Sequence, residues 1–192
     1  MQKLMQDSLT SSIGSCEKCA LSKGRNNVVL CDGDETAKIM LIGEAPGKEE
    51  DAQGKPFVGR AGKLLDELLK TAGVDRQSDL YICNIVKCRP PDNRKPEREE
   101  KEACRPYLIS QIKLVKPRVI ILCGAVAMES FIKEKTTITK ARGRVFENPE
   151  FKGVKFVPVF HPSYLLRNHS TENGSPRDLT KKDLMFVKQL SA

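Results

Sequence analysis

The chain has 192 residues, of which 39% are hydrophobic and 5% aromatic, so it is long enough for one domain with a full core and too short for two ordinary domains. We therefore expect residues 1–192 to form a single domain. The longest apolar run, residues 119–123, cannot span a bilayer, and residues 1–13 lack the apolar core of an export signal, so we expect a cytoplasmic protein. The formal charge of +8 favours a polyanionic partner such as nucleic acid, although a solvated basic surface accounts for the same charge.

Short apolar runs alternate along the chain with stretches of helical periodicity. The apolar runs predict buried strands at residues 38–42, 80–86, 119–123 and 155–160. The helical stretches are residues 60–72, 96 to about 115, 125–133 and 178–190. Because alternating strands and helices are typical of a parallel sheet covered on both faces, the predicted fold class is α/β: a three-layer α/β/α sandwich with a central, mostly parallel four-stranded sheet.

Polar side chains occur where three of these strands end. Glu44 follows the first strand, Asn84 lies at the end of the second, and His161 follows the fourth. Ligands of open parallel sheets bind beyond the carboxyl ends of the strands. The sequence therefore predicts a pocket at this edge of the sheet.

A glycine-rich segment connects the first strand to the first helix. Its glycines allow close approach of the backbone to a ligand, and the start of the helix offers amide donors to a phosphate. A plain strand-to-helix connection explains the same glycines. No Gly-x4-Gly-Lys-Ser/Thr pattern occurs in the chain, which argues against a nucleotide hydrolase.

Four acidic residues in this segment, Glu44, Glu49, Glu50 and Asp51, would repel DNA phosphates. One use for such a carboxylate is to stabilise the sugar cation that forms as a glycosidic bond breaks. We expect three of the four to be solvated at the approach to a helix.

His161 is one of two histidines, and a histidine at a strand end is commonly a structural hydrogen-bonding group. The residues after it, 162–167, contain a proline, two leucines that we expect to be exposed, and an arginine. Such a tip suits a wedge that separates stacked bases.

The chain contains seven cysteines, and a reducing cytosol favours thiols or metal ligands over disulfides. Cys16 and Cys19 lie in a polar segment at a spacing that lets two thiolates bind one metal centre. Cys88 precedes a proline-rich loop, and Cys104 is either a further ligand or a core thiol. Four thiolates suit zinc or an iron–sulfur cluster. The remaining cysteines are predicted to be small core residues: Cys31, Cys83 and Cys123.

Together these segments resemble the family 4 uracil-DNA glycosylases, the iron–sulfur-containing branch of that superfamily in bacteria and archaea. Each motif alone is weak, whereas their shared order and spacing is specific and covers most of the chain. The motifs are Cys16-x2-Cys19, Gly43-Glu44-Ala45-Pro46-Gly47, Gly54-x-Pro56-Phe57-Val58-Gly59-x-Ala61-Gly62, Asn84-x3-Cys88-Arg89-Pro90-Pro91, Cys104-x-Pro106-Tyr107-Leu108 and His161-Pro162-Ser163.

The resemblance implies a monofunctional enzyme that hydrolyses the N-glycosidic bond of deoxyuridine in double- or single-stranded DNA. Uracil would be released, and an abasic site would remain for base-excision repair. Phe57 would stack on the extruded uracil, Asn84 would recognise its hydrogen-bonding edge, and His161 would support negative charge on a uracil oxygen.

The resemblance also implies roles for the residues around the base. Gly43 and Glu44 would line the wall near the sugar, and Leu166 and Arg167 would enter the duplex. In family 1 enzymes an aspartate that handles the attacking water stands where this chain has Ala45. The water-activating group is therefore open between Glu44, which we rank first, and Glu50.

A structural [4Fe–4S] cluster is the cofactor that the resemblance implies. Its ligands would be the four cysteines of the motifs: Cys16, Cys19, Cys88 and Cys104.

Two other classes of protein remain open from the residues alone. A DNA-binding module with an iron–sulfur or zinc centre would leave Asn84 and His161 unexplained. A flavodoxin-like or nucleotide-binding α/β protein would have no need of Cys16 and Cys19. Nothing in the sequence identifies a protein partner such as a replication clamp, and a monomer is the default expectation.

Overall fold

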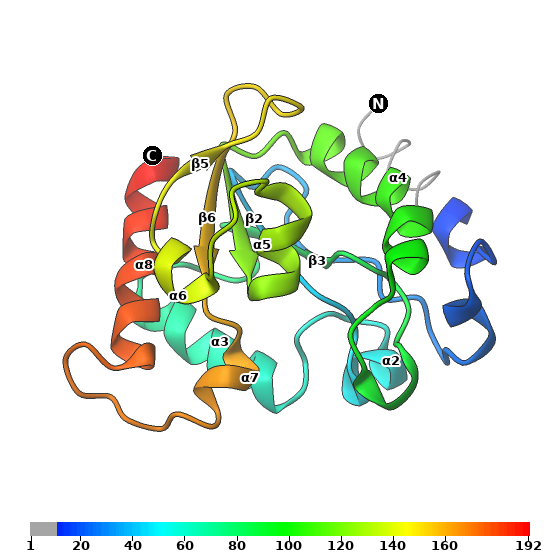
Figure 1. Ribbon diagram of the computed structural model, residues 1–192, viewed down its shortest axis with the longest axis horizontal. Helices are drawn as coiled ribbons and strands as arrows, with labels where there is room; N and C mark the ends of the chain where they lie inside the picture. The colour runs from blue at the N-terminus through cyan, green and yellow to red at the C-terminus, as the bar shows by residue number, and fades with distance from the viewer. Residues whose placement is uncertain (1–10) are drawn as a thin grey trace.

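A six-stranded sheet lies at the centre of the computed structural model, in which residues 11–192 are described (Figure 1). The strand order is β1-β3-β2-β4-β6-β5. The four inner strands are mutually parallel: β2 (Ile39–Gly43), β3 (Leu80–Asn84), β4 (Val119–Cys123) and β6 (Lys155–Val159). At the two edges, β1 (Asp32–Gly33) and β5 (Phe146–Glu147) pair antiparallel with β3 and β6.

The α/β class and the four predicted strands are confirmed. The prediction of a four-stranded sheet is wrong, because two edge strands, β1 and β5, were not predicted. Each edge strand has two residues, which is too short for any apolar alternation. Their conformation comes from pairing with an inner strand, so no local pattern marked them.

Four helices agree with the predicted ones: α3 (Arg60–Thr71), α4 (Arg98–Val115), α5 (Ala125–Phe131) and α8 (Pro176–Ser191). Other helices are short and were not predicted: the 3-10 turns η1 (Ala20–Lys23) and η2 (Pro91–Asn93), and the α-helices α2 (Lys48–Gln53), α6 (Ile138–Ala141) and α7 (Pro162–Leu165). Helices of four to six residues span too few turns to show a hydrophobic period.

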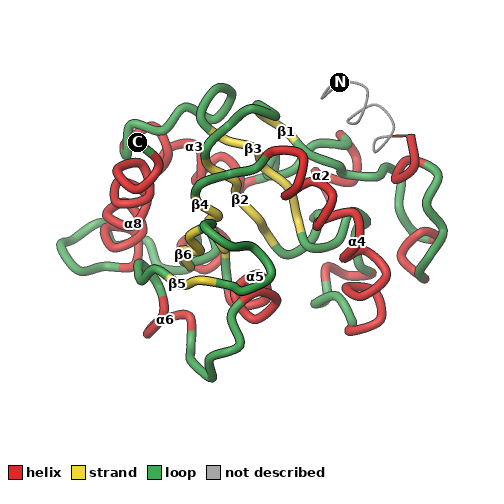
Figure 2. The backbone as a smooth tube through the Cα atoms, turned by 90° about the horizontal axis from the view of Figure 1, so that it is seen from above, coloured by secondary structure: helices red, strands yellow, loops and turns green. Residues whose placement is uncertain are grey.

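The helices cover both faces of the sheet because successive side chains of a strand point to opposite faces. In β2, Ile39 and Leu41 belong to the core formed with α3, α7 and α8, whereas Met40 and Ile42 belong to the core formed with α4 and α5. Figure 2 shows the strands between α3 and α8 on one side and α4 and α5 on the other. Every residue of β2, β3 and β4 is buried, as expected for a sheet in the middle layer.

The carboxyl ends of the parallel strands form one edge of this sheet, and the site described below lies there. Among the helices within residues 11–192, none combines the length and the hydropathy needed to cross a lipid bilayer.

Candidate functional site

A cavity of about 490 Å³ lies beyond the carboxyl ends of the parallel strands, where the topology predicts a pocket. Its volume is within the range of small-molecule sites. Residues from the ends of β2, β3, β4 and β6 contribute to its wall. Six of the predicted site residues line it: Glu44, Glu50, Phe57, Asn84, His161 and Arg167.

Phe57 has an unusual backbone conformation, with φ +53° in the left-handed region. For an aromatic residue this conformation costs on the order of 1–3 kcal/mol and persists only where the surrounding structure enforces it. The next helix packs directly on the Phe57 backbone, because a Cβ atom on Gly62 would collide with the Phe57 carbonyl. The Phe57 ring lies beside His161, with ring centroids 6.0 Å apart and planes inclined by 38°.

Gly43 and Asn84 occupy paired positions at the ends of β2 and β3. Gly43 does not line the cavity; it lies behind Phe57 and Asn84 and leaves the space that they fill. Asn84 is 2% exposed, so its amide must find its partners inside the cavity or the protein. Its main-chain carbonyl accepts a hydrogen bond of 2.6 Å from Nζ of the buried Lys87, which fixes the end of β3.

Both carboxylate oxygens of Glu50 accept backbone amides. Oε1 accepts the amides of Val58 and Gly59 at 3.0 and 2.9 Å, and Oε2 accepts the amide of Gly47 at 3.1 Å. These three amides are therefore not open to a phosphate, which favours the plain strand-to-helix connection over the phosphate-binding alternative. Glu50 instead organises the loop on which Phe57 lies.

The Glu44 carboxylate differs from that of Glu50. Within the described residues, 11–192, it has no hydrogen bond or ion pair with another residue. Burial raises the pKa of Glu44, while Lys95 and Lys101 lower it and Glu129 raises it further. A half-buried carboxylate of this kind is available to a water molecule or to a positive charge in the cavity.

The expectation that three of the four acidic residues are solvated is wrong, because only Glu49 is exposed. Asp51 is buried and accepts hydrogen bonds from the backbone amides of Asn26 and Asn27, so it joins two segments of the fold. The sequence could not predict that backbone amides from other segments bind the carboxylates of Glu50 and Asp51.

His161 caps the N-terminus of α7 through its ring. Its Nδ1 atom accepts the backbone amide of Ser163 at 3.2 Å and lies 2.7 Å from Ser163 Oγ, which places the ring proton on Nε2. Burial lowers the pKa of His161 to about 4; the charge of Glu50 raises it and that of Arg167 lowers it. His161 is therefore neutral at pH 7 and can donate a hydrogen bond from Nε2.

The two leucines after His161 were expected to be exposed, and this is wrong for Leu165, which is fully buried in the core. The single turn of α7 rotates Leu165 inward. Leu166 is partly buried, packs against the same core and does not line the cavity. Arg167 and Tyr164 are exposed and border the cavity. The ring centroids of Tyr164 and Phe160 are 5.1 Å apart.

Residues of two further segments line the cavity but were not predicted as site residues. One segment is the proline-rich loop after Cys88 and the other is α6; they contribute Pro90, Asn93, Arg94, Lys95, Ile138 and Thr139. Because the loop begins at the carboxyl end of β3, its contribution to the cavity could have been predicted from the sequence. The contribution of α6 depends on long-range packing.

Four cysteines come together at a second, smaller cavity, lined by Cys16, Cys19, Cys88 and Cys104. No disulfide joins these four thiols. Within residues 11–192, no group of three or more His, Cys, Asp or Glu side chains lies close enough to hold a single metal ion. Cys104 also packs against the core on the α4 face, so it has features of both alternatives considered for it.

The surroundings of these thiols are basic. Lys18, Arg25 and Lys87 also line the cysteine cavity, and Arg25 Nη1 donates to Cys88 Sγ at 3.4 Å. Burial raises the pKa of Cys88 and Cys104, which opposes ionisation, whereas nearby cations favour it.

The other cysteines lie in the cores, as predicted. Cys83 and Cys123 are fully buried, and Cys31 is partly buried against the core on the α4 face.

Comparison with known proteins places the chain in a family. Residues 31–185 match the model of the uracil DNA glycosylase superfamily. The chain is 47% identical over 169 residues to a type-4 uracil-DNA glycosylase of Thermotoga maritima, covering 88% of this chain and 86% of that protein. Proteins of the same name from Archaeoglobus fulgidus (44% identity; 83% and 82% covered) and Pyrobaculum aerophilum (42%; 87% and 87%) are also similar. The chain therefore belongs to the uracil-DNA glycosylase superfamily.

Proposed function

We propose that this chain is a type-4 uracil-DNA glycosylase that hydrolyses the N-glycosidic bond of deoxyuridine in DNA, releasing uracil and leaving an abasic site for repair. The observation that carries the proposal is that Phe57, Asn84 and His161, which come from three separate segments, border one cavity at the strand ends. Family membership and the type-4 relatives support the same activity.

The cavity would take one flipped base. The Phe57 ring offers an apolar face for stacking, and the Asn84 amide supplies one donor and one acceptor. Uracil presents an O4 acceptor next to an N3–H donor, which matches such an amide. Extrusion of the base costs a few kcal/mol, least for a mispaired or single-stranded nucleotide.

Cleavage would distribute charge between two sides of the cavity. As the bond breaks, uracil leaves as an anion, and His161 would donate from Nε2 to the uracil oxygen that gains negative charge. A neutral donor suits this step because it stabilises the leaving group without first binding a proton.

The sugar becomes cation-like in the same step, and the Glu44 carboxylate would stabilise it and orient the attacking water. We rank Glu44 above Glu50 because both oxygens of Glu50 already accept backbone amides. In this proposal water attacks the sugar directly, and no lysine acts as a Schiff-base nucleophile.

The rim of the cavity would contact the DNA backbone. Arg94, Lys95 and Arg167 border it and supply positive charge for phosphates. In this proposal, Leu166 and Arg167 enter the duplex as the base leaves. Leu166 would have to give up part of its packing against the core to do so.

We propose that the four-cysteine cavity holds a [4Fe–4S] cluster through Cys16, Cys19, Cys88 and Cys104. The donor set fits, because each thiolate of such a cluster binds its own iron and the sulfurs need not converge on one point, as the ligands of a single ion must. The bound cluster would cross-link the N-terminal segment to α4 and to the loop after β3. Lys18, Arg25 and Lys87 would balance its negative charge.

The test is to incubate the pure protein with an end-labelled oligonucleotide that has one uracil, and then to cleave abasic sites with alkali. The expected result is strand scission at the uracil and none in the matched thymine oligonucleotide. Borohydride should trap no enzyme–DNA adduct. If the uracil strand stays intact in single- and double-stranded form, the proposal is wrong.

A further inference from the structure

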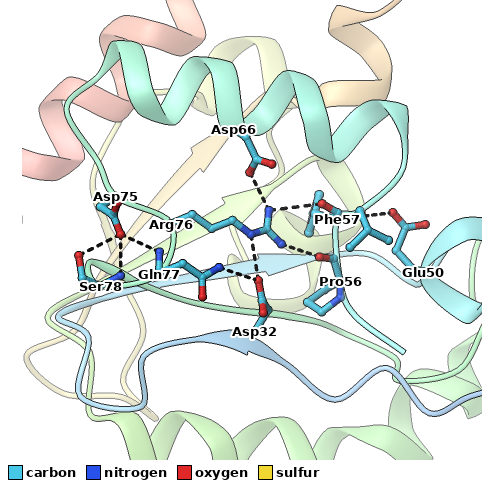
Figure 3. Close-up of polar contacts among 10 residues, drawn as sticks. Asp32, Glu50, Pro56, Phe57, Asp66, Asp75, Arg76, Gln77 and Ser78 are labelled. Atoms are coloured by element: carbon cyan, nitrogen blue, oxygen red, sulfur yellow. Dashed lines mark hydrogen bonds and ion pairs between the residues drawn. The ribbon is translucent and has the colours of Figure 1, made fainter. Parts of the chain in front are cut away.

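Arg76 lies in the connection between α3 and β3, and its guanidinium reaches the loop that positions Phe57 (Figure 3). Nη2 donates to the Pro56 carbonyl at 2.7 Å, and Nη1 donates to the Phe57 carbonyl at 3.3 Å. Arg76 does not line the cavity, so it reaches the site only through this loop.

Two carboxylates from different elements hold the guanidinium. Nε is 2.9 Å from Asp32 Oδ2 in β1, and Nη1 is 2.8 Å from Asp66 Oδ1 in α3. The side chains of Arg76 and Asp32 are each only 15% exposed, so this pair is sheltered from solvent, whereas the Asp66 side chain is 46% exposed. They are charge-assisted and fix the plane of the guanidinium.

The backbone that carries Arg76 is itself fixed by a local turn. The Asp75 carboxylate accepts the amides of Gln77 and Ser78 at 2.9 and 2.8 Å and the Ser78 hydroxyl at 3.0 Å, and Figure 3 shows this turn next to the guanidinium. The direction from which Arg76 approaches the loop is therefore determined.

On the other side of Phe57, Glu50 accepts the amides of Val58 and Gly59. The carbonyls of Pro56 and Phe57 thus bind the Arg76 cation. The two amides that follow Phe57 bind the Glu50 anion. Phe57 lies between them with φ +53°, a conformation that a free aromatic residue would leave. Relaxation to negative φ would turn the ring away from Asn84 and His161.

We infer that Arg76 is a positioning residue, which together with Glu50 holds Phe57 in the strained conformation that places its ring against the flipped uracil. The inference rests on the proposed function and adds a determinant of base binding outside the cavity. A guanidinium suits the task because its planar set of donors serves two carbonyls and two carboxylates at once. A lysine ammonium concentrates three donors at one point and cannot.

The test compares Arg76→Lys and Arg76→Gln with Asp183→Asn. The control variant also breaks a buried ion pair, between Asp183 of α8 and Arg142, but touches neither the cavity nor the Phe57 loop. Three quantities are measured for each folded variant: the thermal midpoint, the single-turnover excision rate, and the inhibition constant of free uracil, which reports base binding without the chemical step.

We expect Arg76→Gln to weaken inhibition by free uracil and to slow excision on the order of 10²-fold, because a displaced positioning group produces losses of this size. Arg76→Lys should lose about tenfold in both quantities. Asp183→Asn should lower the thermal midpoint and leave both quantities unchanged.

Arg76 has no positioning role if both Arg76 variants excise uracil, and are inhibited by free uracil, as the unmodified chain is. The same conclusion follows if they lose only thermal stability, as is expected of Asp183→Asn. Should Arg76→Gln fail to fold, the uracil inhibition constant of Arg76→Lys decides the question. Failure of the proposed function is a separate outcome, since the unmodified chain would then excise no uracil in the same assay.

Discussion

Gly43 lies so close to Phe57 that a Cβ atom on Gly43 would be 2.6 Å from Cζ of the Phe57 ring. The same atom would collide with Oδ1 of Asn84. The ring and the amide that are proposed to hold uracil can therefore approach each other only because position 43 has no side chain.

Gly43→Ala should consequently displace the Phe57 ring or the Asn84 amide. We expect excision to fall on the order of 10²-fold and overpacking to destabilise the fold by about 1–3 kcal/mol. Single-turnover kinetics and denaturant unfolding measure the two effects. Gly24→Ala is the matched control for stability, since open space surrounds Gly24 and its φ is negative. Normal excision by Gly43→Ala would show that the packing behind the cavity is not critical.

Asn84→Asp should change the choice of base. A carboxylate accepts hydrogen bonds from the amino group of cytosine but repels O4 of uracil, so uracil excision should drop sharply and the ratio of cytosine to uracil excision should rise. Paired oligonucleotides that differ only in the target base provide the measurement. An unchanged ratio would remove Asn84 from base recognition.

Glu44→Gln should separate activity from stability. Excision should fall on the order of 10²-fold because the charge facing the sugar is lost. Since burial raises the pKa of Glu44, its ionised form destabilises the fold at neutral pH, and the neutral amide should stabilise it.

The stability gain of Glu44→Gln has a defined pH dependence. It should be complete above the folded-state pKa of Glu44 and disappear as the pH falls below the usual glutamate pKa of 4.5, where Glu44 is protonated in both states. Denaturant unfolding at several pH values tests this, and a variant that is less stable at neutral pH would contradict the assigned burial.

His161 should make the fold sensitive to mild acid. Its pKa is about 4 in the folded state, below the usual histidine pKa of 6.5, so between these two pH values the unfolded chain binds a proton that the folded chain does not. Stability is unaffected above pH 6.5 and decreases as the pH falls towards 4. Between pH 7 and pH 5 this loss amounts to about 2 kcal/mol.

His161→Asn removes that titration. From pH 7 to pH 5, its free energy of unfolding should therefore fall by about 2 kcal/mol less than that of the unmodified chain. The difference between the two unfolding curves is the relevant quantity, because other groups titrate in both proteins. Equal losses would mean that its surroundings do not keep His161 neutral. The variant should also excise uracil about 10²–10³-fold more slowly.

Cys16→Ser and Cys104→Ser should lose iron and the visible absorbance of the cluster, because each removes one of four proposed ligands. Cys31→Ser is the matched control and should keep both, since Cys31 does not line the cysteine cavity. Metal analysis and absorbance spectra decide the result. Zinc in the purified protein, or iron that survives both ligand substitutions, would contradict the cluster.

The sequence predicts elements well where a local pattern determines them. The five apolar residues of β4 coincide with the predicted strand because a central parallel strand is buried on both faces. In contrast, β1 has only Asp32 and Gly33, and its pairing with β3 defines it. The same limit applies to α7, whose single turn reverses the expected orientation of Leu165.

The site follows the same division. The positions of Asn84 and His161 could be predicted because strand order places carboxyl ends together. Thr139 reaches the cavity, and Arg76 reaches the Phe57 loop, through contacts between segments far apart in the chain. The left-handed backbone of Phe57 likewise results from Gly62 and Glu50 and not from a preference of phenylalanine.

The cavity between Phe57, Asn84 and His161 is proposed to accept one flipped uracil and to release it by hydrolysis. The most direct measurement is to quantify free uracil and abasic sites after a single turnover of cluster-loaded protein on a uracil oligonucleotide. We expect equal amounts of the two products, and neither product from the thymine oligonucleotide. Intact deoxyuridine in every strand context, from protein with a full complement of iron, would contradict the proposal.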